Sequence, residues 1–77
     1  MGTRLPTLKA ADVARILEQL SFVRMRQSGS HVFFQHPDGR TTLVPYHGGK
    51  DIGRGLLRQI IREAGLTPEE FSRIRGL

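Results

Sequence analysis

Three short runs of strand-forming residues, separated by two strong turn signals, occupy the middle of the chain. The runs span Phe22–Gln27, Ser30–His36 and Arg40–Pro45, and the intervening turns are Ser28-Gly29 and Pro37-Asp38-Gly39. β-Branched and aromatic residues favour strands, and connections this short join antiparallel neighbours. The middle of the chain therefore predicts a three-stranded antiparallel meander, which limits the possible folds more than any other feature.

Apolar residues at helical spacing flank the meander on both sides. Ala10–Leu20 carries a stripe at the i, i+3, i+4, i+7 spacing of an amphipathic helix. A second stripe runs from about residue 52 or 53 to Ala64, and Gly65 is placed to end that helix. These patterns predict one helix before the meander and one after it.

A short last helix follows from the segment Thr67-Pro68-Glu69-Glu70, which combines a capping box with proline at the first helical position. This helix would carry Phe71 and Ile74. Residues 1–8, interrupted by Pro6, read as a loose lead-in. With 77 residues the chain is expected to form a single domain over residues 1–77.

The predicted order is α-β-β-β-α with a short C-terminal helix, which is an α+β fold. Two amphipathic helices and one amphipathic sheet can share a core only as two layers. Both helices should therefore cover the same face of the sheet and leave the other face open.

The second strand indicates which residues lie on that open face. Because side chains alternate along a strand, Val32 and Phe34 share one side, while His31, Phe33 and Gln35 share the other. If Val32 and Phe34 pack under the helices, His31 lies on the open face.

The same rule applied to the first strand sends Val23 and Met25 toward the core and Arg24 and Arg26 outward. The expected open face then carries a histidine, an aromatic ring and two arginines. His36 is expected on the helix side near a turn, with its ring half-buried.

Charge and composition narrow the class of partner. Twelve Lys and Arg against seven Asp and Glu give a formal charge of +5, which favours nucleic acid, an anionic ligand or an acidic protein. The absence of cysteine excludes disulfides and thiolate zinc sites, and fits a cytoplasmic protein. No apolar run approaches the roughly 18 residues of a membrane span, and no signal peptide is seen, so no membrane is expected.

A metal site is also not expected. The three histidines are His31, His36 and His47. The first two are an odd number of residues apart on one strand and face opposite ways, with no cluster of carboxylates to complete a ligand set. Neither a metal nor a cofactor is predicted.

Several motifs together resemble the HicA family of toxin ribonucleases from bacterial and archaeal toxin–antitoxin modules. The matching segments are Gly29-Ser30-His31-x-x-Phe34 (GSHxxF), Val44-Pro45-x-His47, Lys50-Asp51-Ile52, Gly55-x-Leu57-Arg58-x-Ile60 and Ala64-Gly65-Leu66. The resemblance covers roughly residues 8–71, and Leu56 departs from it because many members have threonine there. It implies a fold similar to a double-stranded-RNA-binding domain, cleavage of mRNA, inhibition of translation and growth, neutralisation by a HicB-type antitoxin, and His31 as the catalytic histidine.

The residues themselves can support that chemistry. RNA cleavage without a metal uses the 2′-OH as nucleophile and needs a proton acceptor, a proton donor and positive charge on the phosphate. His31 suits one proton transfer, because the ordinary pKa of histidine lies near neutrality. The second transfer is left open among His47, Tyr46, Lys50 and the substrate phosphate.

Other residues would bind the RNA. Arg24, Arg26 and Lys50 are candidates for phosphate contacts, Phe33 can stack on a base, and Ser30 belongs to the histidine motif. Backbone N–H groups near Gly53-Arg54-Gly55 offer further phosphate contacts. Two alternatives stay open: a non-catalytic RNA-binding module that uses the same face, and a protein whose charge mainly serves an acidic protein partner.

Overall fold

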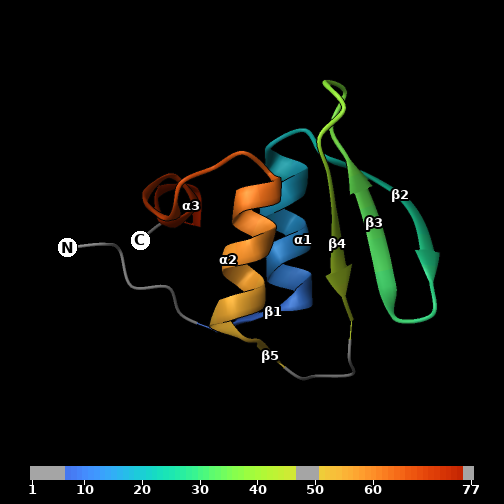
Figure 1. The fold of residues 1–77 in the computed structure, drawn as a ribbon, viewed down its shortest axis with the longest axis horizontal. Coiled ribbons are helices and arrows are strands. Elements are labelled where there is room, and N and C mark those ends of the chain that lie inside the picture. The colour runs from blue at the N-terminus through green and yellow to red at the C-terminus, as the bar shows by residue number, and fades with distance from the viewer. Residues whose placement is uncertain (1–6, 47–50, 76–77) are drawn as a thin grey trace.

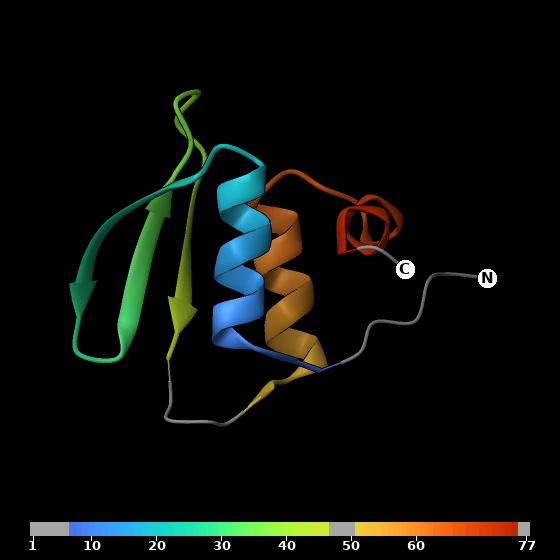
Figure 2. The ribbon, with the colours of Figure 1, turned by 180° about the vertical axis from the view of Figure 1, so that it is seen from behind.

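A sheet of three strands and two helices packed on one of its faces form the body of the molecule (Figure 1). The computed structural model describes residues 7–46 and 51–75. In chain order the elements of this part are β1 (Leu8–Lys9), α1 (Ala10–Gln19), β2 (Val23–Ser28), β3 (His31–Gln35), β4 (Thr41–Pro45), β5 (Asp51–Ile52), α2 (Arg54–Glu63) and α3 (Pro68–Arg75). Helices α1 and α2 lie on the same side of the sheet, and α3 lies beyond α2 on the side remote from the sheet (Figures 1 and 2).

The predicted meander is confirmed. The strands are hydrogen-bonded in the order β2-β3-β4, and both pairs are antiparallel. The two principal helices also begin and end within about two residues of the predicted bounds. The α+β fold of two layers, similar to a double-stranded-RNA-binding domain, is therefore the one expected from the sequence.

The core lies between the helices and β3–β4. Helix α1 contributes Val13, Ile16 and Leu17, and α2 contributes Leu57, Ile60 and Ile61, all nearly inaccessible. Opposite them, the sheet buries Val32, Phe34 and Val44. Helical spacing brings each apolar set to one side of its helix, and strand alternation does the same for the sheet.

The first-strand prediction is wrong for three residues. Val23 and Met25 are 52% and 53% exposed, and Arg24 lies on the helix side of the sheet, because its cross-strand partner is the buried Phe34. All six residues of β2 are exposed. The physical reason is that β2 is an edge strand that curves away from the helices (Figures 1 and 2), so it has no core to contact.

A β-bulge then changes the alternation within β2. The register with β3 shifts between Arg24 and Arg26, which places Arg26 opposite Phe33 on the open face. A bulge inserts one unpaired residue, so the residues on either side of it are no longer related by simple alternation. Arg26 thus faces outward as predicted, while Arg24 does not.

A second, very short sheet was not predicted. Strand β1 pairs antiparallel with β5, so Leu8 lies opposite Ile52 and Lys9 opposite Asp51. Leu8 is buried in the core and is not part of a loose lead-in. The Lys9 ammonium lies 2.9 Å from the Asp51 carboxylate, and its hydrogen bond lowers the pKa of that carboxyl.

Side-chain hydrogen bonds fix the start of α3 and the turn between β3 and β4. The capping box is confirmed: the Thr67 hydroxyl accepts from the Glu70 N–H at 3.1 Å, and the Glu70 carboxylate accepts from the Thr67 N–H at 2.8 Å. At the β3–β4 turn, Arg40 donates to the Asp38 carboxylate at 2.8 Å and to the Ala64 carbonyl at the end of α2. The hydrogen bond from Arg40 holds the pKa of Asp38 below its ordinary value of 3.8.

Candidate functional site

His31 is the first residue of β3 and is exposed on the open face of the sheet. The next residue inward, Val32, is 1% exposed, and Phe34 is fully buried, so strand alternation turns His31 outward. Gly29 precedes it with φ +59°, a left-handed conformation that favours glycine, and its carbonyl accepts a hydrogen bond from the Gln27 amide. The tight turn therefore presents the histidine at the end of the sheet.

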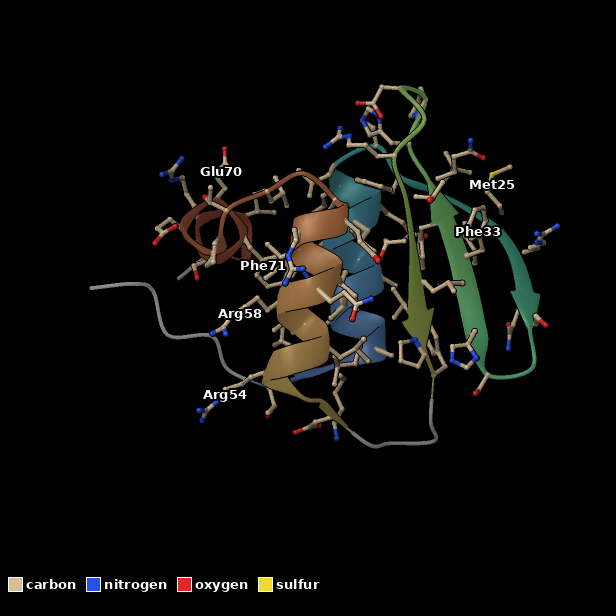
Figure 3. All side chains as sticks on the ribbon, viewed as in Figure 1. Met25, Phe33, Arg54, Arg58, Glu70 and Phe71 are labelled. Carbon is tan, nitrogen blue, oxygen red and sulfur yellow. The ribbon has the colours of Figure 1, made fainter. Side chains whose placement is uncertain are left out.

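Phe33 and Arg26 form the middle of the open face. The Arg26 guanidinium carbon lies 5.5 Å from the centroid of the Phe33 ring, a cation–π arrangement across neighbouring strands. On the other side Phe33 pairs with Leu43, which is 49% exposed. Figure 3 labels Phe33 and Met25 on this part of the sheet. An aromatic ring, an arginine and an aliphatic side chain thus lie in a row beside His31.

Arg24 belongs to a different surface. Its guanidinium carbon lies 5.7 Å from the ring centroid of Phe34 and 5.5 Å from that of Tyr46, and it donates a hydrogen bond to the Tyr46 hydroxyl at 3.0 Å. These contacts place Arg24 and the Tyr46 hydroxyl on the helix side of the sheet, away from His31. The structure does not bring the two predicted arginines together.

The remaining predicted residues have varied positions. Ser30 is half-buried in the turn before β3, and its carbonyl accepts a 2.5 Å hydrogen bond from the Tyr46 N–H. His36 is half-buried with its ring edge-on to Phe22 at 5.2 Å, on the helix side as predicted. His47 and Lys50 lie outside the described residues.

A groove of about 340 Å³ begins at His31 and continues across the edge of β4 to α2. The sheet contributes the side chains of His31, Phe33 and Leu43, and α2 contributes those of Leu56, Gln59 and Glu63. We call this space the β4–α2 groove. It joins the exposed histidine to a set of residues that are far away in the sequence.

The far wall of the groove carries an oriented carboxylate. One oxygen of Glu63 accepts a 2.7 Å hydrogen bond from the Thr42 hydroxyl, and the other accepts from the Gln59 amide at 3.3 Å. Sequence reasoning did not identify these residues. The available signal was the spacing of Leu56, Gln59 and Glu63, which puts them on one flank of α2 next to its buried stripe.

The described part of the chain contains no group of three or more histidine, cysteine, aspartate or glutamate side chains that could hold a metal ion. His31 and His36 lie on opposite faces of the sheet, as their odd spacing predicts. None of the described helices is long and apolar enough to cross a membrane.

Comparison with known proteins relates the chain to one family. Residues 10–66 match a family model described as the HicA toxin of bacterial toxin-antitoxin systems. A relative from Pseudomonas fluorescens (strain Pf0-1), named "Probable mRNA interferase HicA", is 32% identical over 59 residues. That alignment covers 77% of this chain and 97% of the relative. The matched region includes both principal helices, the whole β2-β3-β4 sheet and His31.

Proposed function

The chain belongs to the HicA toxin family, and on this premise we propose that it is a toxin endoribonuclease that cleaves mRNA and so inhibits translation and growth. His31 would act as general acid or base, without a metal ion. The observation that carries the assignment of His31 is its exposure at the end of the open face, beside Phe33 and Arg26. Histidine in such a position can reach a substrate, and its imidazole can give or accept a proton.

The proposed reaction is an attack of the ribose 2′-oxygen on the adjacent phosphorus. The P–O5′ bond breaks, a 2′,3′-cyclic phosphate forms, and the proton lost from the 2′-OH is balanced by one gained at the 5′-oxygen. His31 would make one of these two transfers. Among the partners considered, the Tyr46 hydroxyl contacts Arg24 on the opposite side of the sheet. His47, Lys50 and the phosphate itself remain the candidates for the second transfer.

RNA would bind along the open face. Arg26 lies on this face and would contact a phosphate, and the neighbouring Phe33 offers a ring on which a base can stack. The N–H groups at the start of α2, near Gly53, are further candidates for phosphate contacts. The net charge of +5 would add a long-range attraction for the polyanion.

The partner would be a HicB-type antitoxin in the cytoplasm, and no membrane would be involved. The open face supports this because it combines arginine with exposed apolar side chains, Val23 and Leu43 among them. A protein partner with acidic and apolar groups could cover such a surface and block access to His31.

The test is induced expression of the wild-type protein and of His31→Ala, with mRNA integrity and growth as the readouts. We expect wild type to degrade mRNA and arrest growth, and His31→Ala to lose about 10²–10⁴-fold in cleavage rate in vitro. Gln35→Ala, on the same strand and face, is the matched control and should stay active. A folded His31→Ala protein with full activity would refute the role of His31, and loss of cleavage in EDTA would refute metal independence.

The second candidate is a non-catalytic RNA-binding module, favoured by the Arg26–Phe33 pair. In that case RNA would survive incubation intact. Arg26→Ala would weaken binding, and His31→Ala would have little effect on binding or growth.

A further inference from the structure

The β4–α2 groove differs in chemistry from the rest of this basic molecule. Apart from His31 at one end, the described residues that line it include no basic side chain, although the chain as a whole has twelve lysines and arginines. The groove does contain the carboxylate of Glu63. A phosphate would be repelled from this wall, whereas an uncharged group with hydrogen-bond donors would be attracted.

The Glu63 carboxylate is held in a fixed orientation. The Thr42 side chain, from a residue only 3% exposed, donates to one oxygen, and the Gln59 amide donates to the other. A carboxylate has about four acceptor positions, so two hydrogen bonds leave capacity for further donors. Because Glu63 itself is exposed, that capacity is accessible to a ligand in the groove.

The other walls suit a flat apolar ring. Phe33 and Leu43 lie opposite each other across β3 and β4, and Leu56 faces the groove from α2. A volume of about 340 Å³ lies at the lower end of the range for small-ligand sites. A single unstacked nucleobase combines an apolar face with polar edges, as these walls require.

We propose that the β4–α2 groove binds one base of single-stranded RNA next to the cleaved phosphate, and that Glu63 is a specificity residue. Its carboxylate accepts from the exocyclic amino group of cytosine, adenine or guanine. Uracil has no amino group, and its one ring N–H on that edge lies between two carbonyl oxygens, which would meet the carboxylate unfavourably. This inference rests on the proposed function, since it names the substrate feature that the same site selects.

Binding to uncleavable RNA tests the proposal directly. The probes are single-stranded 2′-O-methyl octamers of uridine, with or without one central cytidine, which lack the nucleophilic hydroxyl. Titration of the wild-type protein should show at least about tenfold tighter binding of the cytidine octamer, the effect of one hydrogen bond to a charged acceptor. Equal affinity for the two octamers would overturn the proposal.

Glu63→Gln identifies the residue responsible. Glutamine keeps an oxygen to accept from Thr42, but it replaces one acceptor with an N–H donor, so the cytidine-to-uridine ratio should fall to about one or reverse. Losing a negative charge can raise the affinity for both octamers, so the ratio is the readout. Glu18→Gln, on the exposed side of α1, makes the same charge change outside the groove and should leave the ratio unaltered. An unaltered ratio in Glu63→Gln would exclude Glu63 as the specificity residue.

Mapping of cleavage sites separates this inference from the proposed function. If the wild type cleaves RNA with no base preference and Glu63→Gln gives the same pattern, the base site is wrong and the nuclease assignment stands. If the protein leaves RNA intact but still prefers the cytidine octamer, the nuclease assignment is wrong and the base site stands.

Discussion

Strands β2 and β3 are hydrogen-bonded neighbours, yet they have very different environments. In β3, Val32 and Phe34 are almost completely buried beneath the helices. In β2, every residue is exposed, and the strand curves away from the helices (Figure 2). The contrast divides the molecule into a helix-covered half, made of α1, α2, β3 and β4, and an uncovered strand, β2. It indicates that folding stability resides mainly in the first, while β2 is free to present binding groups.

The largest expected effect tests that division by truncating one large side chain in each part. Phe34→Ala should reduce the free energy of unfolding by about 3–5 kcal/mol, because it leaves a cavity in the core. Met25→Ala, at a side chain 53% exposed, should change it by less than about 0.5 kcal/mol. Urea unfolding followed by circular dichroism measures both. If the two variants lose similar amounts of unfolding free energy, β2 contributes to stability as the helix-covered half does, and the division between them is wrong.

Replacing either of two glycines with positive φ by alanine should also reduce the free energy of unfolding, but by less than Phe34→Ala does. Gly29 (φ +59°) lies in the β2–β3 turn with open space around it, and Gly65 (φ +77°) ends α2. A methyl group at Gly65 would lie 2.9 Å from the Arg40 guanidinium, which is held by the Asp38 carboxylate and the Ala64 carbonyl. Alanine at either position should cost about 1–2 kcal/mol of backbone strain.

Gly65→Ala should cost about 1 kcal/mol more than Gly29→Ala, because the Arg40 hydrogen bonds must also be disturbed. Thermal unfolding of the two variants side by side measures the difference. The control is Gly65→Ala made in the Arg40→Ala background and compared with Arg40→Ala alone. Because the obstructing side chain is then absent, the extra cost of Gly65→Ala should disappear. Equal losses in Gly29→Ala and Gly65→Ala would mean that Arg40 moves aside freely.

The same contrast explains what could be predicted from the sequence. Alternation predicts correctly which side chains of β3 are buried, because one layer of helices covers that face of the strand along its length. It fails for Val23 and Met25 because apolar character alone does not reveal that an edge strand lacks a covering layer. The β1–β5 pair was missed because two residues are too few for a periodic signal, and their partners are far apart in sequence.

In the candidate site, too, some features follow from one strand alone and others depend on how the elements pack. The exposure of His31 follows from its own strand, and the structure agrees with it. Glu63 was missed because it reaches the groove only through the packing of α2 against β4, which no local pattern encodes. The separation of Arg24 from Arg26 depends on a bulge, whose position was not evident from residue types.

Replacing the two arginines on either side of that bulge should have the smallest effects on stability. Arg24 contacts Phe34 and Tyr46 and donates to the Tyr46 hydroxyl, so it ties β2 to the covered half. Arg24→Ala should therefore cost about 1–2 kcal/mol of stability, from the loss of cation–π contacts with two rings and of one hydrogen bond. Arg26→Ala removes the cation–π contact with Phe33 and should cost about 0.5–1 kcal/mol of stability.

RNA affinity should rank the two arginines in the opposite order, because Arg26 shares the open face with His31 and Arg24 does not. Titration of a single-stranded RNA into each alanine variant, at several salt concentrations, measures this. Arg26→Ala should lower the steepness of the salt dependence by about 0.7, the value for one lost phosphate contact on a single strand, and Arg24→Ala should leave it unchanged. A larger salt effect from Arg24 would move the RNA to the helix side of β2 and overturn the assignment of the open face.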